Sequence, residues 1–559
     1  METIRRSPGA RTLTYSVVLV LLAALFIARH AGAQQVVAPP PTSKADCGPG
    51  SNPESGLQGR VSREEVDSGR TAEGYTCNME EIGHFGRRGG YKVERYIDAA
   101  GHECAYYDST LLFPKDAVQV GQTDTGVYVL DMTDPSNPVR TELLDTPAMQ
   151  SPHESMALNQ ERGLIAAVTA NPVFLPGFID VWDVSQDCRH PVLRTSAPVA
   201  GLGHEGNWAP DGMTYYSASL DGGTVTAVDL TNPAAPAPLW VGNYRSHGMS
   251  VSDDGNRTYL AARTGLIILD TSQIQRRVPN PQVSVVSTLS WDMISTPQHT
   301  IPVTIDGHPY LVEVDEFDRN DIVGAARIID IADEKNPKVV SDIRLEVHQP
   351  ENRAMLKNDP GAGDGTQDGL QGYSAHYCEV PQREEPGLLA CTMILSGVRL
   401  IDIRDPFNPK EIGYFNGPAV PAPTAPSGGT GDGANYAMSK PAIVPERGEI
   451  WYSDGNKGFY SLRVTNGAWP FAPEACPRVA LGSLNHVVGS VGRDVLRGTP
   501  GKDVLCGLGG RDRIIGRGGN DLLFGGPGRD TLIGGPGRDL CHGGPGRDRI
   551  ARSCEDRSF

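Results

Sequence analysis

"GVYVLDMTDPSNP", at residues 126–138, carries the pattern that decides the fold of the middle of the chain. An apolar run rich in β-branched residues ends at Asp131 and leads into a polar stretch that contains proline. β-Branched residues favour strands, whereas Asp, Asn and Pro favour turns. The segment therefore predicts a β-strand that ends at an aspartate and is followed by a tight turn.

The same phrase returns five more times along the chain. The further copies are FIDVWDVSQDCRHP from Phe178, TVTAVDLTNPAAP from Thr224, GLIILDTSQ from Gly265, ARIIDIADEKNP from Ala326 and GVRLIDIRDPFNP from Gly397. Their aspartates are Asp131, Asp183, Asp229, Asp270, Asp330 and Asp402, which are 52, 46, 41, 60 and 72 residues apart. A period of about 40–50 residues filled with short strands predicts the blades of a β-propeller.

One copy shows a whole repeat unit. In HGMSVSDDGNRTYLAARTGLIILD, from His247, two short strands and a turn precede the phrase, and elsewhere a fourth strand follows it, as in PVRTELL from Pro138. A seventh unit, KPAIVPERGEIWYSDGNKGFYSLRVT from Lys440, lacks the final aspartate. We therefore predict an all-β protein with a seven-bladed β-propeller over residues 100–466, and six or eight blades are the alternatives. The phrase resembles the LVIVD repeat of bacterial surface and secreted propellers, which implies this fold but no particular function.

A second repeat occupies the C-terminal end of the chain. Three nearly identical nonapeptides follow one another at residues 525–550, in GGPGRDTLIGGPGRDLCHGGPGRDRI. Aspartates recur at every ninth position, at Asp494, Asp503, Asp512, Asp521, Asp530, Asp539 and Asp548. Two residues after each comes Leu496, Leu505, Ile514, Leu523, Leu532, Cys541 or Ile550. This pattern resembles the nonapeptide of the repeats-in-toxin proteins and predicts a parallel β-roll over residues 489–559.

The nonapeptide predicts calcium binding. Glycines allow tight turns with positive φ, and the turns offer only carbonyl and carboxylate oxygens, which a hard cation such as Ca²⁺ prefers. The last three repeats are intact and add the glycines Gly525, Gly526, Gly528, Gly534, Gly535, Gly537, Gly543, Gly544 and Gly546 to the seven aspartates, whereas the first four lack the second glycine. One apolar residue in nine buries too little surface to order the tail, so we expect calcium to fold it.

Histidines begin most of the predicted blades. They are His153, His204, His247, His299 and His376, with His102 as a looser sixth, and each stands 23–31 residues before the aspartate of its blade. Innermost strands line the channel of a propeller, so we expect these side chains to converge at one mouth. Converging imidazoles suit Cu, Zn or Fe. Copper-dependent propellers such as the selenium-binding protein family use axial histidines in this way, although only that general similarity is present here.

The alternative is that these histidines only form hydrogen bonds between blades and line a water-filled channel. Three of them precede a glutamate, at Glu103, Glu154 and Glu205. Neighbouring residues of a strand point to opposite faces, so we expect these glutamates to face the blades. The isolated residues His348 and Glu316 are expected to be ordinary loop or rim residues.

The N-terminus predicts export. Arg5, Arg6 and Arg11 precede an apolar run at 17–28 and the small residues at 31–33, which is the order of a secretory signal peptide over residues 1–33. An uncleaved anchor is the alternative. We expect a Pro-rich lead and an irregular segment over 34–99, a linker over 467–488, and no membrane span once the signal peptide is removed.

In an oxidising compartment the ten cysteines become disulfide candidates. Cys378 and Cys391 flank a predicted hairpin turn at equal distances, so they could pair across its strands; two reduced core cysteines are the alternative. Cys541 holds an inward position of the roll, and a bond to Cys554 would tie down the last turn. The other pairings stay open.

Two functions remain. The net charge of −17 argues against a nucleic-acid partner, and the sequence has no phosphate loop, nucleophile elbow or Cys-x-x-Cys motif. The sequence favours a secreted or cell-surface, bacterial calcium-binding protein whose propeller is a scaffold for an unknown protein or surface ligand. The alternative is an exported enzyme, an oxidoreductase among the options, that depends on Cu, Zn or Fe at the histidine cluster.

Overall fold

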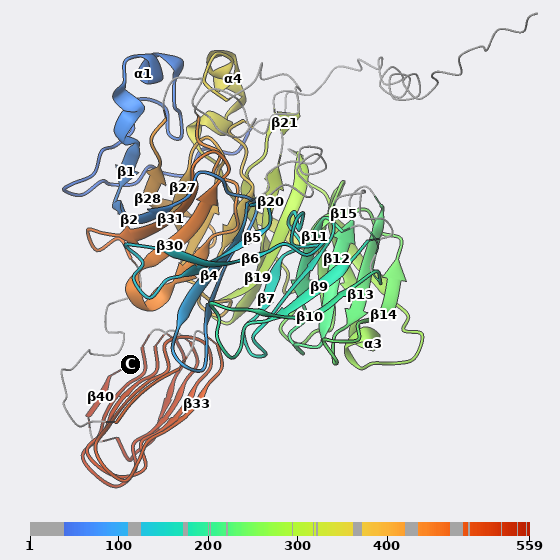
Figure 1. Cartoon of the computed structure of the whole chain (residues 1–559). Coiled ribbons are helices and arrows are strands. Elements are labelled where there is room, and N and C mark those ends of the chain that lie inside the picture. Colours follow the sequence, from blue (N-terminus) through green and yellow to red (C-terminus); the bar gives the residue numbers. More distant parts are fainter. Residues whose placement is uncertain are drawn as a thin grey trace, which may run out of the picture. The chain divides into compact units, whose positions relative to one another are not determined.

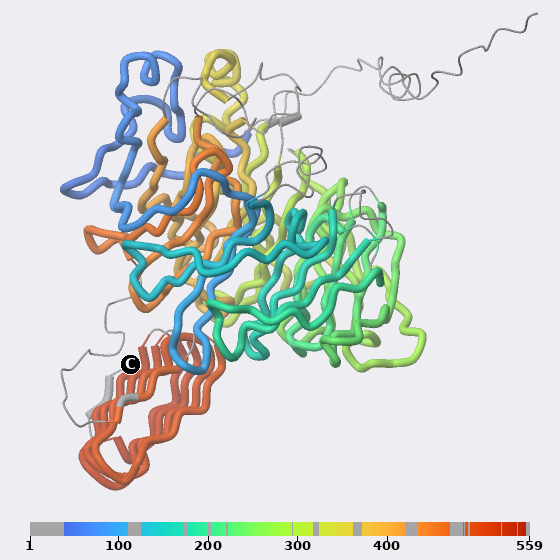
Figure 2. The backbone as a smooth tube through the Cα atoms, in the orientation of Figure 1, coloured from blue at the N-terminus to red at the C-terminus, as the bar shows by residue number. Residues whose placement is uncertain are grey.

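The computed structural model describes an all-β chain (Figures 1 and 2). It covers residues 38–109, 124–170, 177–199, 201, 203–219, 222–292, 295–316, 318–319, 322–361, 372–419, 434–469, 485–489, 492–526, 528–544, 546–554 and 556–558. The expected signal peptide and the start of the expected lead, before residue 38, lie outside this range. Within it, no helix combines the length and the apolar character that crossing a membrane would need.

Seven antiparallel sheets form the blades of a propeller. Blade A holds β3 (Val93–Ile97), β4 (Glu103–Asp108), β5 (Val127–Asp131) and β6 (Val139–Leu144). Blade B holds β7 (Ala157–Asn159), β8 (Leu164–Val168), β9 (Ile179–Asp183) and β10 (Val192–Ala197). Blade C holds β11 (Glu205–Trp208), β12 (Thr214–Ser219), β13 (Thr224–Asp229) and β14 (Ala237–Gly242). Blade D holds β15 (Ser246–Val251), β16 (Arg257–Ala262), β17 (Gly265–Asp270) and β18 (Ser284–Leu289).

The last three blades carry additions to this plan. Blade E holds β19 (Thr296–Ile305), β20 (His308–Glu316), β23 (Ala326–Asp330) and β24 (Lys338–Ile343), with a small hairpin of β21 (Asp318–Arg319) and β22 (Ile322–Val323) between its middle strands. Blade F holds β25 (Tyr377–Glu379), β26 (Leu388–Thr392), β27 (Val398–Asp402), β28 (Lys410–Asn416) and, as a fifth strand, β1 (Tyr75–Cys77). Blade G holds β29 (Ala442–Val444), β30 (Glu449–Asp454), β31 (Gly458–Val464) and β2 (Met79–Phe85).

Helices are few and short in the part of the chain that the structure describes. They are α1 (Arg63–Asp67), η1 (Arg70–Glu73), α3 (Ser272–Gln275), η3 (Glu346–His348), η4 (Pro350–Asn352), α4 (Arg353–Leu356) and η5 (Pro445–Arg447). All of them lie in connections before, within or between blades, so the folded core is built from strands.

The prediction of seven blades is confirmed, and the ring closes with a strand from its beginning. β2 pairs antiparallel with β31 as the outer strand of blade G, so this blade combines strands from both ends of the propeller sequence (Figure 1). The propeller therefore starts before residue 100, and three strands lie in the segment 34–99 that we expected to be irregular. The segment MEEIGHF of β2 escaped sequence reasoning because an edge strand exposes its glutamates and lacks the blade phrase.

The hydrophobic core lies between blades. Seven buried clusters each join two neighbouring blades around the ring, from A–B to G–A. The B–C cluster, for example, packs Ile179 and Val181 against Tyr215 and Val228. Apolar side chains on both faces of the middle strands are buried in this way, which explains why those strands read as continuous apolar runs.

The repeated aspartate has a local structural role. In each of the six phrases its Oδ1 accepts the backbone N–H of the residue two positions later, at 2.8–3.0 Å. This Asx turn ends the third strand and starts the connection to the fourth. The aspartates therefore hold turns and are not ligands of the channel.

We predict that Asp183→Ala lowers the free energy of unfolding of the propeller by about 1–2 kcal/mol, because the Asp183 carboxylate accepts hydrogen bonds from both the N–H and the hydroxyl of Ser185. Urea unfolding at saturating calcium measures the effect. Asp183→Asn keeps an acceptor oxygen and should lose less than half as much. Equal losses in the two variants would contradict the role of the Asx turn.

The C-terminal segment forms a parallel β-solenoid, called here the roll (residues 485–558). One sheet contains β32 (Asn485–Val488), β34 (Asp503–Cys506), β36 (Leu522–Phe524), β38 (Leu540–His542) and β40 (Asp556–Ser558), and the other contains β33 (Val495–Arg497), β35 (Arg513–Ile515), β37 (Thr531–Ile533) and β39 (Arg549–Ile550). Paired residues such as Val504 and Leu522 are 18 positions apart, so one turn uses two nonapeptides (Figure 2). The predicted inward residues form its thin core, and the roll begins four residues earlier than expected.

Disulfides link both folded parts internally. The two predicted bonds, Cys378–Cys391 and Cys541–Cys554, are present, and the first joins residues directly opposite each other in β25 and β26. Cys47–Cys77 and Cys104–Cys188 are further bonds, and Cys506 is also disulfide-bonded. None of the cysteines in the part of the chain described above is free.

Candidate functional sites

Four of the six predicted histidines converge where the innermost strands begin. His153, His204 and His376 directly precede the first strands of blades B, C and F or the loops that lead into them, and His247 is the second residue of β15. Together with two buried carboxylates they form what we call the channel cluster. Its members are His153, Glu154, His204, His247, Glu316 and His376.

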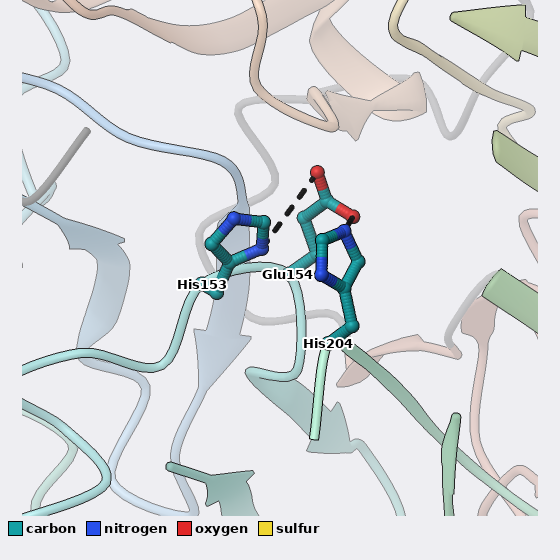
Figure 3. A group of neighbouring side chains, drawn as sticks. All are labelled: His153, Glu154 and His204. Atoms are coloured by element: carbon teal, nitrogen blue, oxygen red, sulfur yellow. Dashed lines mark ion pairs between the residues drawn. The ribbon is translucent and has the colours of Figure 1, made fainter. Parts of the chain in front are cut away.

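Glu154 lies at the centre of the channel cluster. Its Oε1 lies 3.2 Å from His376 Nε2 and 3.9 Å from His153 Nδ1. Its Oε2 lies 3.4 Å from His204 Nε2 (Figure 3). The same oxygen lies 3.5 Å from His247 Nδ1. One carboxylate thus faces four imidazole rings that come from four different blades.

Glu316 is the second carboxylate of the cluster, and it contacts two of these rings. It lies 2.9 Å from His247 Nε2 and 3.6 Å from His376 Nε2. His376 Nδ1 donates a hydrogen bond of 2.5 Å to the carbonyl of Met438, so its Nε2 faces the two glutamates. His247 Nε2 also lies 2.9 Å from His204 Nε2, which makes one connected network of the cluster.

Burial and charge divide the four imidazoles into two kinds. Burial lowers the pKa of His153 and His204, so these rings stay neutral at neutral pH. Burial acts in the same direction on His247 and His376, but Glu154 and Glu316 outweigh it. They raise the pKa of His247 above its usual value, and they raise the pKa of His376 to about 10. Burial would raise the pKa of Glu154, but its imidazole neighbours bring it well below the usual range. These shifts favour ionised Glu154 and Glu316 and charged His247 and His376, whereas they favour neutral rings for His153 and His204.

The two glutamates correct the sequence interpretation. Glu154 was expected to face its blade, but His153 has a φ of 51° and Glu154 forms a single parallel bridge with Glu205, so strand alternation does not apply there. Glu316 was expected to be a rim residue, but it ends β20 fully buried within the cluster. His348 is also no rim residue, because its buried ring bonds the backbone of Leu345 and Tyr373.

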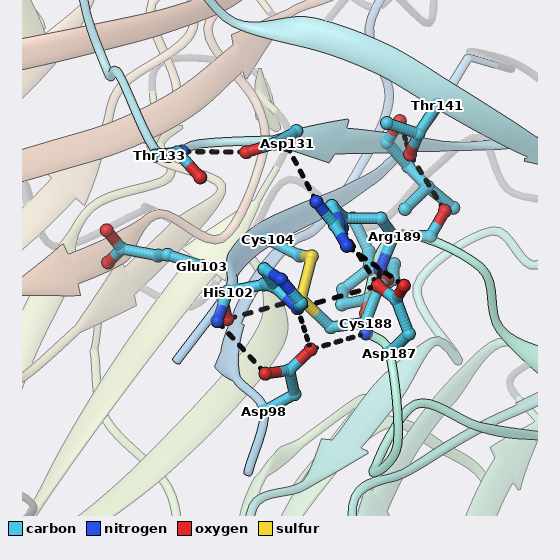
Figure 4. The surroundings of a disulfide bond; sticks show 12 residues. Asp98, His102, Glu103, Cys104, Asp131, Thr133, Thr141, Asp187, Cys188 and Arg189 are labelled. Carbon is cyan, nitrogen blue, oxygen red and sulfur yellow. Dashed lines mark hydrogen bonds and ion pairs between the residues drawn. A yellow bond between two sulfur atoms is a disulfide. The ribbon is translucent and has the colours of Figure 1, made fainter. Parts of the chain in front are cut away.

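The remaining two histidines lie elsewhere. His299 Nδ1 lies 2.6 Å from Glu205, which also faces Lys92 at 3.7 Å, and this group borders a polar cavity of about 140 Å³ lined by the first strands of several blades. His102 contacts Asp98 beside the disulfide Cys104–Cys188 (Figure 4). It precedes the second strand of blade A, which runs antiparallel to the first, so it lies at the opposite end of the blade from the cluster.

The roll aligns its aspartates along the stack. Oδ1 of one aspartate accepts the backbone N–H of the aspartate 18 residues earlier at 2.8–2.9 Å, for the five pairs from Asp494–Asp512 to Asp530–Asp548. The second oxygen, Oδ2, is buried and makes no hydrogen bond to the described residues in Asp512, Asp521, Asp530 and Asp548. Rows of buried, unsatisfied carboxylate oxygens fit a hard cation such as Ca²⁺.

The first glycine of each repeat makes room for these oxygens. A Cβ atom at Gly507 would collide with Asp512 Oδ2 and with the carbonyl oxygen of Gly525 in the next turn. The same holds at Gly516 for Asp521 and the carbonyl oxygen of Gly534. The turn backbone therefore approaches the carboxylates closely, which is the arrangement that brings both kinds of oxygen to one ion.

The second glycine meets a backbone requirement, because its φ is +90° at Gly526 and +114° at Gly535. In earlier repeats Leu508 and Arg517 stand at this position with φ of 75° and 80°. Residues with a Cβ are disfavoured there by about 1 kcal/mol. The degenerate repeats thus keep the turn geometry at the expense of stability.

We predict that Leu508→Gly and Arg517→Gly each stabilise the roll by up to about 1 kcal/mol, because glycine relieves the left-handed conformation although it also gains freedom when unfolded. The midpoint of calcium-induced folding should shift to lower calcium. Arg511→Gly, at a position without positive φ, is the control and should not stabilise. A loss of stability in both variants would contradict this explanation.

The carboxylates of the roll have shifted pKa values. Burial, with repulsion from aspartates one turn away, raises the pKa of Asp512 to about 8, of Asp521 to about 6 and of Asp530 to about 7. In a folded roll without a cation, Asp512 therefore stays largely protonated near neutral pH and Asp530 partly protonated, whereas Asp521 is mostly ionised. A bound cation would have to displace those protons.

We predict that calcium-driven folding of the roll releases few protons between pH 6 and 8, because the calcium-free chain is unfolded and its aspartates, with pKa values of about 3.9, are already ionised. A folded calcium-free roll would behave differently: it would hold protons, lose stability as the pH rises from about 4 to 8, and release those protons when calcium binds. Calorimetric titration in buffers of different ionisation enthalpy measures the released protons. Release of one or more protons per chain, with an affinity that increases from pH 6 to 8, would show that the calcium-free roll is already folded.

Comparison with known proteins identifies the repeats of the roll. A family model described as the RTX calcium-binding nonapeptide repeat matches residues 484–514 and 515–550. A search of curated proteins finds no match. Similar solved structures include hydrazine synthase of Kuenenia stuttgartiensis, with 12% identity over 68% of this chain and 97% of that chain and a TM-score of 0.44. A protein from Lactobacillus plantarum has 12% identity over 65% and 96% with a TM-score of 0.42, and a functionally unknown protein from Desulfotomaculum acetoxidans has 12% over 62% and 88% with 0.39.

Proposed function

We propose that the protein is a secreted or cell-surface scaffold in which a seven-bladed propeller presents its loops to a protein or surface ligand and a C-terminal roll folds on calcium. The observation that carries this proposal is the row of buried Oδ2 atoms in the roll, which coincides with the matched RTX calcium-binding repeats. RTX repeats and disulfides are typical of extracellular proteins, where calcium is abundant and thiols are oxidised.

The residues of the roll define how calcium would act. The Oδ2 atoms of Asp512, Asp521, Asp530 and Asp548 face inward without a hydrogen bond to the described residues, and glycine carbonyls of the neighbouring turn lie beside the carboxylates. Bound calcium would neutralise the negative charge of these buried carboxylates. The apolar core holds essentially one residue per repeat, so ion binding has to contribute much of the folding free energy.

The propeller is stable by other means. Seven inter-blade clusters bury its apolar residues, and disulfides add covalent links. Calcium is therefore not needed for its fold. The resemblance of the blade phrase to LVIVD repeats supports display of the propeller at a surface, whereas nothing in the comparisons favours the alternative of an exported metal-dependent enzyme.

Hydrogen exchange of the full-length protein, followed by mass spectrometry, tests the proposal. In chelator, amides of residues 485–558 should exchange at rates near those of an unfolded chain, and millimolar calcium should protect them while magnesium does so weakly. Peptides of the propeller should not change. Asp530→Ala combined with Asp539→Ala should weaken the calcium response, whereas Asp134→Asn, in an exposed propeller turn, should leave it unaltered. Protection of the roll in chelator, or none at millimolar calcium, would refute calcium-driven folding.

A further inference from the structure

We propose that the channel cluster binds one divalent first-row transition-metal ion, with His153 Nδ1, His204 Nε2 and a carboxylate oxygen of Glu154 as its protein ligands. This site is separate from the calcium sites in sequence and in chemistry. The roll offers only oxygen, whereas two imidazole nitrogens and one carboxylate favour Zn²⁺, Fe²⁺, Cu²⁺ and their neighbours over Ca²⁺ or Mg²⁺.

The geometry of the three residues suits a single ion. One ligand atom from each lies within 4.8 Å of the others, and the separations from Glu154 are 3.9 Å to His153 and 3.4 Å to His204 (Figure 3). Ligands at 2.0–2.2 Å from one ion are separated by roughly 3.0–4.3 Å. A small closing rotation of the side chains would therefore bring all three into coordination.

Two polar atoms aimed into this space lack hydrogen bonds. His153 Nδ1 and Glu154 Oε2 are buried and have no hydrogen-bond partner among the described residues. Buried polar atoms in folded proteins are nearly always satisfied. A metal ion between them accounts for both, and for a histidine held at a φ of 51° to direct its ring inward.

The surroundings hold the three ligands in place. The ring of Tyr91 stacks on His153 with centroids 4.2 Å apart and an interplanar angle of 23°. His376, oriented by the carbonyl of Met438, holds the Glu154 carboxylate from the side of Oε1. Such outer contacts orient metal ligands and set their affinity.

His204 is the ligand that must give up a hydrogen bond to bind the ion, and it is also the most exposed of the three. Its Nε2 faces His247 Nε2 at 2.9 Å, and His247 has a second acceptor in Glu316 at the same distance. The N–H at His247 Nε2 can therefore donate its hydrogen bond to Glu316 in place of His204. The lone pair of His204 Nε2 is then available to the ion. The side chain of His204 is 21% exposed, whereas that of Glu154 is 1% exposed, so an ion reaches the site past His204.

A second group of metal-binding residue types serves as the internal control. Asp98, His102 and Asp187 are also close enough to hold an ion. However, the Asp98 carboxylate already accepts backbone N–H groups of Ala100, His102 and Cys188 and contacts the ring of His102. These bonds explain its position without an ion.

Cobalt titration of the full-length protein tests the proposal. Protein stripped with a chelator and kept in saturating calcium is titrated with Co²⁺, whose ligand-field absorption reports coordination by the protein. We expect one Co²⁺ per chain, displaced by Zn²⁺ but not by additional Ca²⁺. His204→Gln and Glu154→Gln should weaken binding at least about 100-fold, and His102→Gln and Asp530→Ala should leave it unchanged.

Three results would overturn the proposal: no bound Co²⁺ at millimolar concentration, unchanged binding by His204→Gln, or loss of binding in His102→Gln. Circular dichroism checks that each variant is folded. If the cluster variants do not fold, electron paramagnetic resonance of Cu²⁺-loaded wild-type protein decides, because two imidazole ligands produce nitrogen hyperfine structure and an all-oxygen site does not. Failure of this experiment leaves the calcium response of the roll untouched, so the two proposals are tested independently.

Discussion

The pairing of β2 with β31 is the interaction on which the propeller depends. It connects the first strands of the ring to its last blade, so the seven blades form a closed circle in which each packs on two neighbours. In a closed ring every innermost strand begins at the same end of the channel. The channel cluster is a direct consequence, because its six residues come from blades B, C, D, E and F and meet only if all five keep their places.

The roll depends on a different balance. Its core holds essentially one apolar side chain per nonapeptide, while aspartates 18 residues apart place carboxylates of equal charge on adjacent turns. Burial and repulsion raise the pKa values of these groups, so the folded form without a cation has to hold protons. The propeller is stabilised by apolar contacts between blades, whereas the roll combines a thin apolar core with buried carboxylates, so we expect the two parts to respond differently to calcium.

Much of this organisation could be predicted from local patterns. The six blade aspartates repeat because each closes an Asx turn, and the nonapeptide repeats because each residue has one place in a stacked turn, so both patterns are visible in the sequence. β2 could not be predicted, since an edge strand that completes a distant blade carries no repeat of its own. Glu154 and Glu316 were misjudged for two other reasons. The backbone departs from regular strand geometry at His153, and Glu316 gains its role only through contacts with His247 and His376 from other blades.

The charges of the channel cluster separate its members into two groups. The carboxylates of Glu154 and Glu316 lie against His247 and His376, and these contacts favour the ionised forms of all four side chains. His153 and His204 differ from them, because burial favours the neutral form of both rings. The metal ion that we propose would bind beside these two rings, where His153 Nδ1 and Glu154 Oε2 have no hydrogen-bond partner among the described residues.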